Sequence, residues 1–192
     1  MIAQSFIADT SLRALRSAIG SVVDYGVFPG LDIRRAGATG LPAVCDLERT
    51  ERLEFFIAWS ISFRLNDLRG GHSWLSLDVG PDEPGTTEGI VAASPREPSL
   101  GPCGSVSFSD GWKIAECDSG VRPAILHLWP ESPISSIEIL RIGTYAAAVF
   151  HHDEQSSWAF YGEYDGNTFV TLDGRVCDAL RGESDESLAV TP

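Results

Sequence analysis

Long apolar runs are missing from this chain of 192 residues. No run approaches the about 20 consecutive apolar residues that a membrane helix needs. The first residues also lack the basic-then-apolar layout of a secretory signal. We therefore expect a cytoplasmic protein that does not engage membranes.

Cysteine is scarce as well, with one residue at each of positions 45, 103, 117 and 177 and no CxxC spacing. Thiols this few and this scattered do not make a disulfide framework in a chain of this length. We expect them to be reduced and buried, as is usual in the cytoplasm.

The short motifs of common enzyme classes are absent too. The chain holds no GxGxxG before a helical pattern, no GxxxxGK followed by Ser or Thr, no GxSxG and no HExxH. Their absence argues against dinucleotide enzymes, P-loop nucleotide hydrolases, α/β-hydrolases and zinc peptidases of the usual types. We expect no cofactor, and we favour a binding protein over an enzyme.

Basic residues are outnumbered, with 14 Lys and Arg against 27 Asp and Glu and a net charge of -13. Residues 1–96 contribute 9 - 12 = -3, and residues 97–192 contribute 5 - 15 = -10. A field of this sign repels nucleic acid and steers a basic partner toward the protein. The basic residues include a single lysine, Lys113, and this arginine bias suggests a GC-rich bacterium or its phage.

What the chain does contain is a regular alternation over residues 53–65. Every odd position is large and apolar: Leu53, Phe55, Ile57, Trp59, Ile61, Phe63 and Leu65. Period-two alternation predicts one long strand with a buried face, and residues 74–79 predict its hairpin partner across a loop at 66–71. A helix over 53–68 is the alternative, but aromatic and β-branched residues favour the strand.

Helical signals lie near the N-terminus. Asp9, Thr10 and Ser11 offer N-cap side chains, and Gly20 can end a short amphipathic helix in the left-handed conformation. Residues 46–52 predict a further turn of helix. Residues 80–102 are rich in Pro, Gly, Ser and Thr, and predict a loop or a weak boundary within the domain.

The second half alternates between turn signals and short apolar runs. Asp-Gly pairs between such runs are typical of hairpins, because both residues tolerate positive φ. The runs predicted as strands are 105–108, 112–117, 124–129, 136–142, 144–150, 157–164, 168–172 and 175–180. The fold class is therefore α+β, predominantly antiparallel β in a meander or curved sheet, with one or two short helices. Residues 1–181 form one domain, and 182–192 are predicted to be a flexible acidic tail.

Residues 151–154 are the densest group of metal-capable side chains. On extended chain, alternate residues share a face, which pairs His151 with Asp153 and His152 with Glu154. Spacing places no third ligand beside either pair. A polar hairpin loop is the simpler interpretation, and we predict no metal site.

Cysteine and histidine together make the other catalytic candidates. His127 with Cys103 or Cys117, or His72 with Cys45, would provide a thiolate and its base if the two side chains met. Nothing in the spacing brings them together, so no catalytic residue is assigned.

Aromatic and acidic residues gather between positions 153 and 173. The candidate binding residues are Trp158, Tyr161, Glu163, Tyr164, Asp165, Asp153 and Glu154. Aromatic anchors among acids suit a protein-binding face, because the rings supply contact area and the acids supply steering. An amphipathic strand with its aromatics turned inward is the alternative.

These observations favour a non-catalytic acidic protein that binds a basic partner, such as a toxin or nuclease, as a bacterial immunity protein or phage-type inhibitor does. A small cysteine/histidine or metal-dependent hydrolase is one alternative. A small-ligand-binding β protein, with a cavity beneath Trp59 and Phe63, is another.

Overall fold

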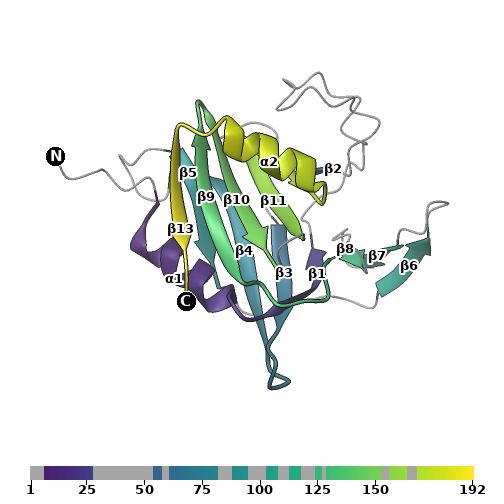
Figure 1. Cartoon of the computed structure of the whole chain (residues 1–192). Coiled ribbons are helices and arrows are strands. Elements are labelled where there is room, and N and C mark those ends of the chain that lie inside the picture. Colours follow the sequence, from purple (N-terminus) through teal and green to yellow (C-terminus); the bar gives the residue numbers. More distant parts are fainter. Residues whose placement is uncertain are drawn as a thin grey trace.

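The computed structural model describes residues 7–27, 54–57, 61–81, 88–94, 103–107, 113–117, 124–126, 129–152, 156–163 and 168–192. In these ranges the chain forms two antiparallel sheets and two short helices (Figure 1). The predicted fold class, mainly antiparallel β with few helices, is therefore confirmed. None of the helices in this part of the chain is long and apolar enough to cross a membrane.

Sheet A contains seven strands in the order β5-β4-β3-β1-β8-β7-β6. These strands are β1 (Val22–Val27), β3 (Ile61–Asn66), β4 (His72–Pro81), β5 (Glu88–Ala93), β6 (Cys103–Ser107), β7 (Lys113–Cys117) and β8 (Ala124–Leu126). Sheet B contains six strands in the order β13-β9-β10-β11-β12-β2. They are β2 (Glu54–Ile57), β9 (Ser136–Ile142), β10 (Tyr145–His151), β11 (Ser157–Glu163), β12 (Thr168–Thr171) and β13 (Glu186–Val190).

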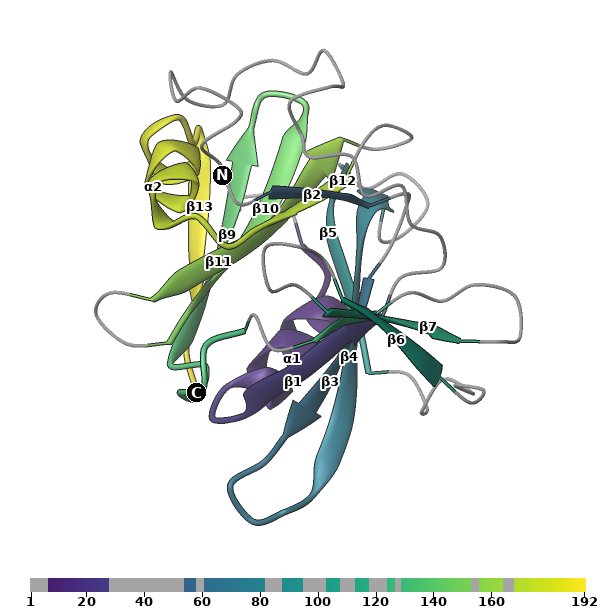
Figure 2. The same cartoon turned by 90° about the vertical axis from the view of Figure 1, so that its right-hand side faces the viewer.

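The main core lies between the two sheets (Figure 2). Ile61, Phe63 and Leu65 of β3 point into it, and Phe63 pairs in register with Leu75 of β4. From sheet B, Trp158 reaches across until its ring centroid lies 4.9 Å from that of Phe63. Aromatic contacts of this kind join the two layers into one core.

Helix α1 (Asp9–Ala18) covers the edge of sheet A at β5. The predicted helix is confirmed, and Gly20 adopts φ +88° just beyond it. The predicted cap is wrong, because the N-cap residue is Ala8 and Ser11 is buried. Ser11 instead accepts a hydrogen bond from the Ala92 N–H at 2.9 Å and donates to the Ala92 carbonyl at 3.3 Å.

The long strand predicted over residues 53–65 is wrong in extent. Residues 54–57 form β2 at the edge of sheet B, whereas residues 61–66 form β3 inside sheet A. The apolar alternation is present in both segments because both are extended strands. The predicted pairing of β3 with β4 is confirmed, with Ile61 opposite Leu77.

Residues 175–180, predicted as a strand, belong to helix α2 (Gly174–Gly182). The Asp173 side chain accepts the Arg175 N–H and caps the helix, so the Asp-Gly pair starts a helix here and does not close a hairpin. Val176, Cys177 and Leu180 are buried against the outer face of sheet B, where they form a second core. Figure 1 shows α2 lying across β9, β10 and β11.

The acidic tail predicted at 182–192 is also wrong. Residues Glu186–Val190 form β13, which pairs with β9 so that Leu188 lies opposite Ile139. This pairing is nonlocal, and the short acidic segment has no strong strand pattern of its own. Within the loop predicted at 80–102, residues Glu88–Ala93 form β5 and pair with β4. The helical turn predicted at 46–52 lies outside the described residues.

Candidate functional site

The aromatic side chains proposed as binding anchors are buried. Trp158 and Tyr161 lie on β11, which has strand neighbours on both sides and is covered by sheet A on one face and α2 on the other. Trp158 stacks on Phe150 with centroids 3.9 Å apart, and Tyr161 stacks on Phe169 at 5.3 Å. The prediction that these rings are exposed anchors is therefore wrong. The alternative of inward-facing aromatics describes them.

His152 is buried beside Trp158 and accepts its indole hydrogen bond. The Trp158 indole N–H donates to His152 Nε2 at 2.8 Å, and His152 Nδ1 lies 2.6 Å from the Ser132 carbonyl oxygen. An indole nitrogen can only donate and a carbonyl oxygen can only accept, so His152 carries its proton on Nδ1. Both ring nitrogens are used within the protein, which makes His152 unsuitable as the metal ligand considered from the sequence.

His151 points to the opposite face of β10, at the side of sheet B that carries α2. Arg181 Nη2 of α2 lies 3.0 Å from His151 Nδ1, and the Ser157 hydroxyl lies 3.1 Å from the same nitrogen. Glu138 accepts from Arg181 Nε at 3.1 Å and lies 3.7 Å from His151 Nε2. This cluster ties α2 to strands β9, β10 and β11.

The environment of His151 disfavours its charged form. Partial burial lowers its pKa first, the Arg181 cation lowers it further, and Glu138 opposes both effects. A neutral imidazole beside a paired arginine fits a hydrogen-bonding role. Among the residues that the structure describes, no group of three His, Cys, Asp or Glu side chains is placed to hold a metal ion.

Each predicted cysteine–histidine pair includes a residue outside the described part of the chain. Cys177 lies on the buried face of α2, where burial raises the pKa of its thiol to about 12. Cys103 and Cys117 are Cα partners in the β6–β7 pair, and His72 is exposed at the start of β4. Cys45 and His127 lie outside the described residues, as does Trp59, beneath which a cavity was predicted.

Of the remaining predicted binding residues, one is described by the structure and four are not. Glu163 is half-buried at the end of β11, where its carboxylate accepts a hydrogen bond from the Thr144 hydroxyl at 2.5 Å. Asp153, Glu154, Tyr164 and Asp165 lie outside the described residues. The candidate binding face therefore keeps one described acid and loses its two described rings.

A different group of acids lies together on the outside of sheet B. We call Asp178, Glu183, Asp185 and Glu186 the acidic surface, because they follow one another from the exposed side of α2 into β13. The side chain of Asp178 is 74% exposed, and that of Glu186 is 52% exposed. Asp185 anchors the group by accepting the Gly143 N–H at 2.7 Å, at the tip of the β9–β10 turn.

The arginines near the acidic surface are already paired. Arg181 donates to Asp178 at 2.9 Å and to Glu138, while Arg141 lies 3.9 Å from Glu186. Over residues 173–186 there are five acids and two bases, so 2 - 5 = -3. The surface therefore stays negative after these ion pairs are counted. The charge count predicted that this part of the chain is acidic. The prediction of a flexible tail at 182–192 missed that these acids lie on an ordered segment.

Comparison with known proteins adds nothing to this geometry: no family model, no curated protein and no solved structure matches the chain.

Proposed function

We propose that this protein is a non-catalytic binding module whose acidic surface engages a basic protein partner. An immunity protein or phage-encoded inhibitor that occludes a toxin or nuclease in the bacterial cytoplasm is the form of this function that we favour. The observation that carries the proposal is the fixed position of four acids: Asp178 on α2, Glu186 on β13, and Glu183 and Asp185 in the connection between them, where their backbone N–H groups donate to Ala179 and Arg141 carbonyls. Acids on a hydrogen-bonded backbone need less ordering when a partner binds than acids on a mobile tail do.

Two further observations support binding over catalysis. Cys177 is buried, and its thiol pKa of about 12 leaves little thiolate at neutral pH. His151 and His152 are both engaged in contacts that hold sheet B and its neighbours together. Their contacts give each histidine a structural role.

The test uses purified proteins encoded by genes adjacent to this one, restricted to those with an excess of Lys and Arg. Binding is measured by calorimetry and by stopped-flow kinetics at increasing salt. Charge steering predicts an association rate that falls roughly tenfold or more as salt rises, because the acids act mainly before contact. Binding that ignores salt, or no binding by any neighbour, would contradict the proposal.

A matched pair of variants locates the surface. Asp178→Asn/Glu183→Gln removes two charges from the acidic surface, and Asp9→Asn/Glu131→Gln removes two exposed charges elsewhere. We expect the first variant to slow association several-fold, roughly threefold to tenfold, and the second to leave it near the wild-type rate. Equal effects would show that net charge acts without a defined surface.

A further inference from the structure

A β-bulge in β1 shapes the outer face of sheet A. Val23 pairs with Leu65, but Tyr25 pairs with the preceding residue Arg64, so Asp24 is the extra residue. Without the bulge, Tyr25 would share the inward face of Val23. The bulge turns Tyr25 outward beside Arg64 and frees Asp24 from pairing. Bulges of this kind commonly re-aim side chains at functional sites.

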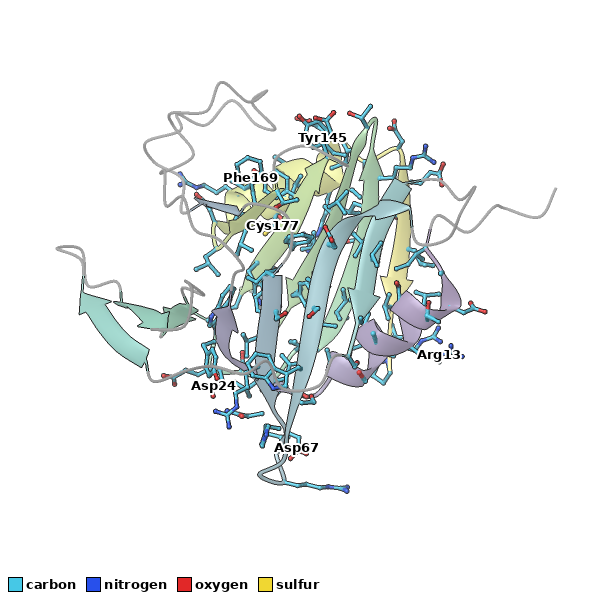
Figure 3. All side chains as sticks on the ribbon, turned by 180° about the vertical axis from the view of Figure 1, so that it is seen from behind. Arg13, Asp24, Asp67, Tyr145, Phe169 and Cys177 are labelled. Carbon is cyan, nitrogen blue, oxygen red and sulfur yellow. The ribbon has the colours of Figure 1, made fainter. Side chains whose placement is uncertain are left out.

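The side chains of Tyr25, Arg64 and Trp74 meet on this outer face. Figure 3 labels the adjacent residue Asp24. Arg64 lies opposite Tyr25 on one side and opposite Trp74 of β4 on the other. The guanidinium carbon of Arg64 is 5.8 Å from the Tyr25 ring centroid, and the Tyr25 and Trp74 rings meet edge to face at 5.8 Å. Asp24 fixes the guanidinium by accepting from Arg64 Nη1 at 3.0 Å.

Two N–H groups in this cluster are left without acceptors. Among the described residues, Arg64 Nε and Trp74 Nε1 are the buried side-chain nitrogens that have no hydrogen-bond partner. Trp74 is 4% exposed, so water does not replace the missing acceptor at its surface. Buried donors are nearly always paired in folded proteins, because an unpaired one loses its hydration without compensation. Because these two unpaired donors belong to residues that face each other in the β3–β4 pair, we expect one acceptor to serve both.

We propose that Tyr25, Arg64 and Trp74 form a binding site for the carboxylate of a small molecule. A carboxylate presents two acceptor oxygens in one plane, and it can accept from Arg64 Nε with one and from Trp74 Nε1 with the other. The carboxylate charge assists both bonds, and the guanidinium charge strengthens the one from Arg64. Asp24 holds the fork from Nη1 and leaves the Nε edge for the ligand.

Among the described residues, the neighbouring polar side chains do not supply the acceptor. The Ser62 and Ser76 hydroxyls, one register step away on the same face, bond each other at 2.6 Å. The Asp24 carboxylate accepts from Arg64 Nη1 and not from Nε. Asp24 precedes Tyr25 in β1. The site is separate from the acidic surface, which lies on sheet B, so it is independent of the proposed partner binding.

The test is an NMR titration of the free protein with sodium benzoate at constant ionic strength, with benzamide as the uncharged analogue of the same shape. The Trp74 indole N–H resonance should move and saturate with benzoate. The Trp158 indole N–H already donates to His152, so its resonance should stay in place and serves as an internal control. Benzamide should bind about tenfold more weakly, because it lacks the second acceptor oxygen and the charge.

Two variants assign the donors, with benzoate affinity measured by calorimetry. Arg64→Lys keeps the charge but removes Nε, and Trp74→Phe keeps an aromatic ring but removes the indole N–H. Each should weaken benzoate about tenfold, whereas Arg69→Lys, at the exposed β3–β4 turn, should not. No saturable Trp74 shift, equal binding of benzamide, or unchanged affinity in both variants would overturn the site.

Discussion

Trp158, in the core between the two sheets, and Trp74, on the outer face of sheet A, are both buried, but only Trp158 has an acceptor for its N–H. Around Trp158 the polar groups satisfy one another, and His152 links the ring to the Ser132 carbonyl. Around Trp74 a bulge brings an arginine and a tyrosine together and leaves two donors open. Paired buried groups stabilise the fold, whereas unpaired ones cost stability, and this cost is the basis for proposing a ligand at Trp74.

Replacing each tryptophan by phenylalanine gives the largest expected contrast. Both substitutions remove the same ring atoms and the same N–H. Trp158→Phe also strands His152 Nε2 without its donor, so we expect it to lower the free energy of unfolding by about 1–3 kcal/mol more than Trp74→Phe does. Urea unfolding of the two variants measures the difference. Equal losses would mean that the two N–H groups have equivalent surroundings.

The cap of α2 tests how firmly the outer face of sheet B is closed. Asp173 accepts the Arg175 N–H at 3.0 Å and also binds the Arg175 side chain. Asp173→Ala should cost about 1 kcal/mol of unfolding free energy, and Asp173→Asn should cost clearly less because it keeps a capping oxygen. Thermal unfolding followed by circular dichroism compares them. An alanine variant as stable as wild type would show that α2 is held by packing alone.

The His151 cluster predicts a pH dependence. The pKa of the His151 imidazole is lowered in the folded protein, mainly by burial and then by Arg181. The unfolded chain therefore binds more protons between the folded pKa and about 6.5, and the stability contribution, complete above 6.5, is lost as the pH falls through that window.

His151→Gln removes this titration and keeps a polar side chain near Ser157. We expect its unfolding free energy to change less with pH across that window than that of the wild-type protein, as measured by urea unfolding at a series of pH values. Identical slopes would assign the pH dependence to other groups.

Thiol labelling gives the smallest expected signal. Cys177 is on the buried face of α2 and its pKa is raised to about 12, so iodoacetamide at neutral pH should leave it unmodified in the folded protein. Peptide mapping by mass spectrometry separates Cys177 from the other cysteines, and a sample labelled in urea provides the fully modified control. Rapid labelling of native Cys177 would show that α2 opens readily.

The strands of the fold were largely predictable, because period-two alternation is local. Ile61, Phe63 and Leu65 alternate as strand residues, and their partner strand follows after one short loop. The change of sheet between β2 and β3 is a nonlocal choice that alternation does not encode. For α2, Val176, Cys177 and Leu180 fit a short helix as well as an apolar strand, and the tertiary contact with sheet B decides between them.

The candidate sites were less predictable, because they depend on register and on burial from both sides. Trp158 looks like an anchor in the sequence, yet β11 is covered on both faces, and a strand in that position carries apolar residues throughout. Arg64 and Trp74 are ten positions apart and show no motif. Only the β3–β4 pairing and the bulge at Asp24 bring their unpaired donors together.

The most direct test of this contrast is a through-hydrogen-bond NMR experiment on the ligand-free protein with its side-chain nitrogens labelled. Nitrogen–nitrogen coupling should connect Trp158 Nε1 to His152 Nε2, and the Trp74 indole proton should resonate upfield of the Trp158 proton as an unbonded donor does. A missing Trp158–His152 coupling, or a Trp74 proton shifted downfield like that of Trp158, would contradict the account.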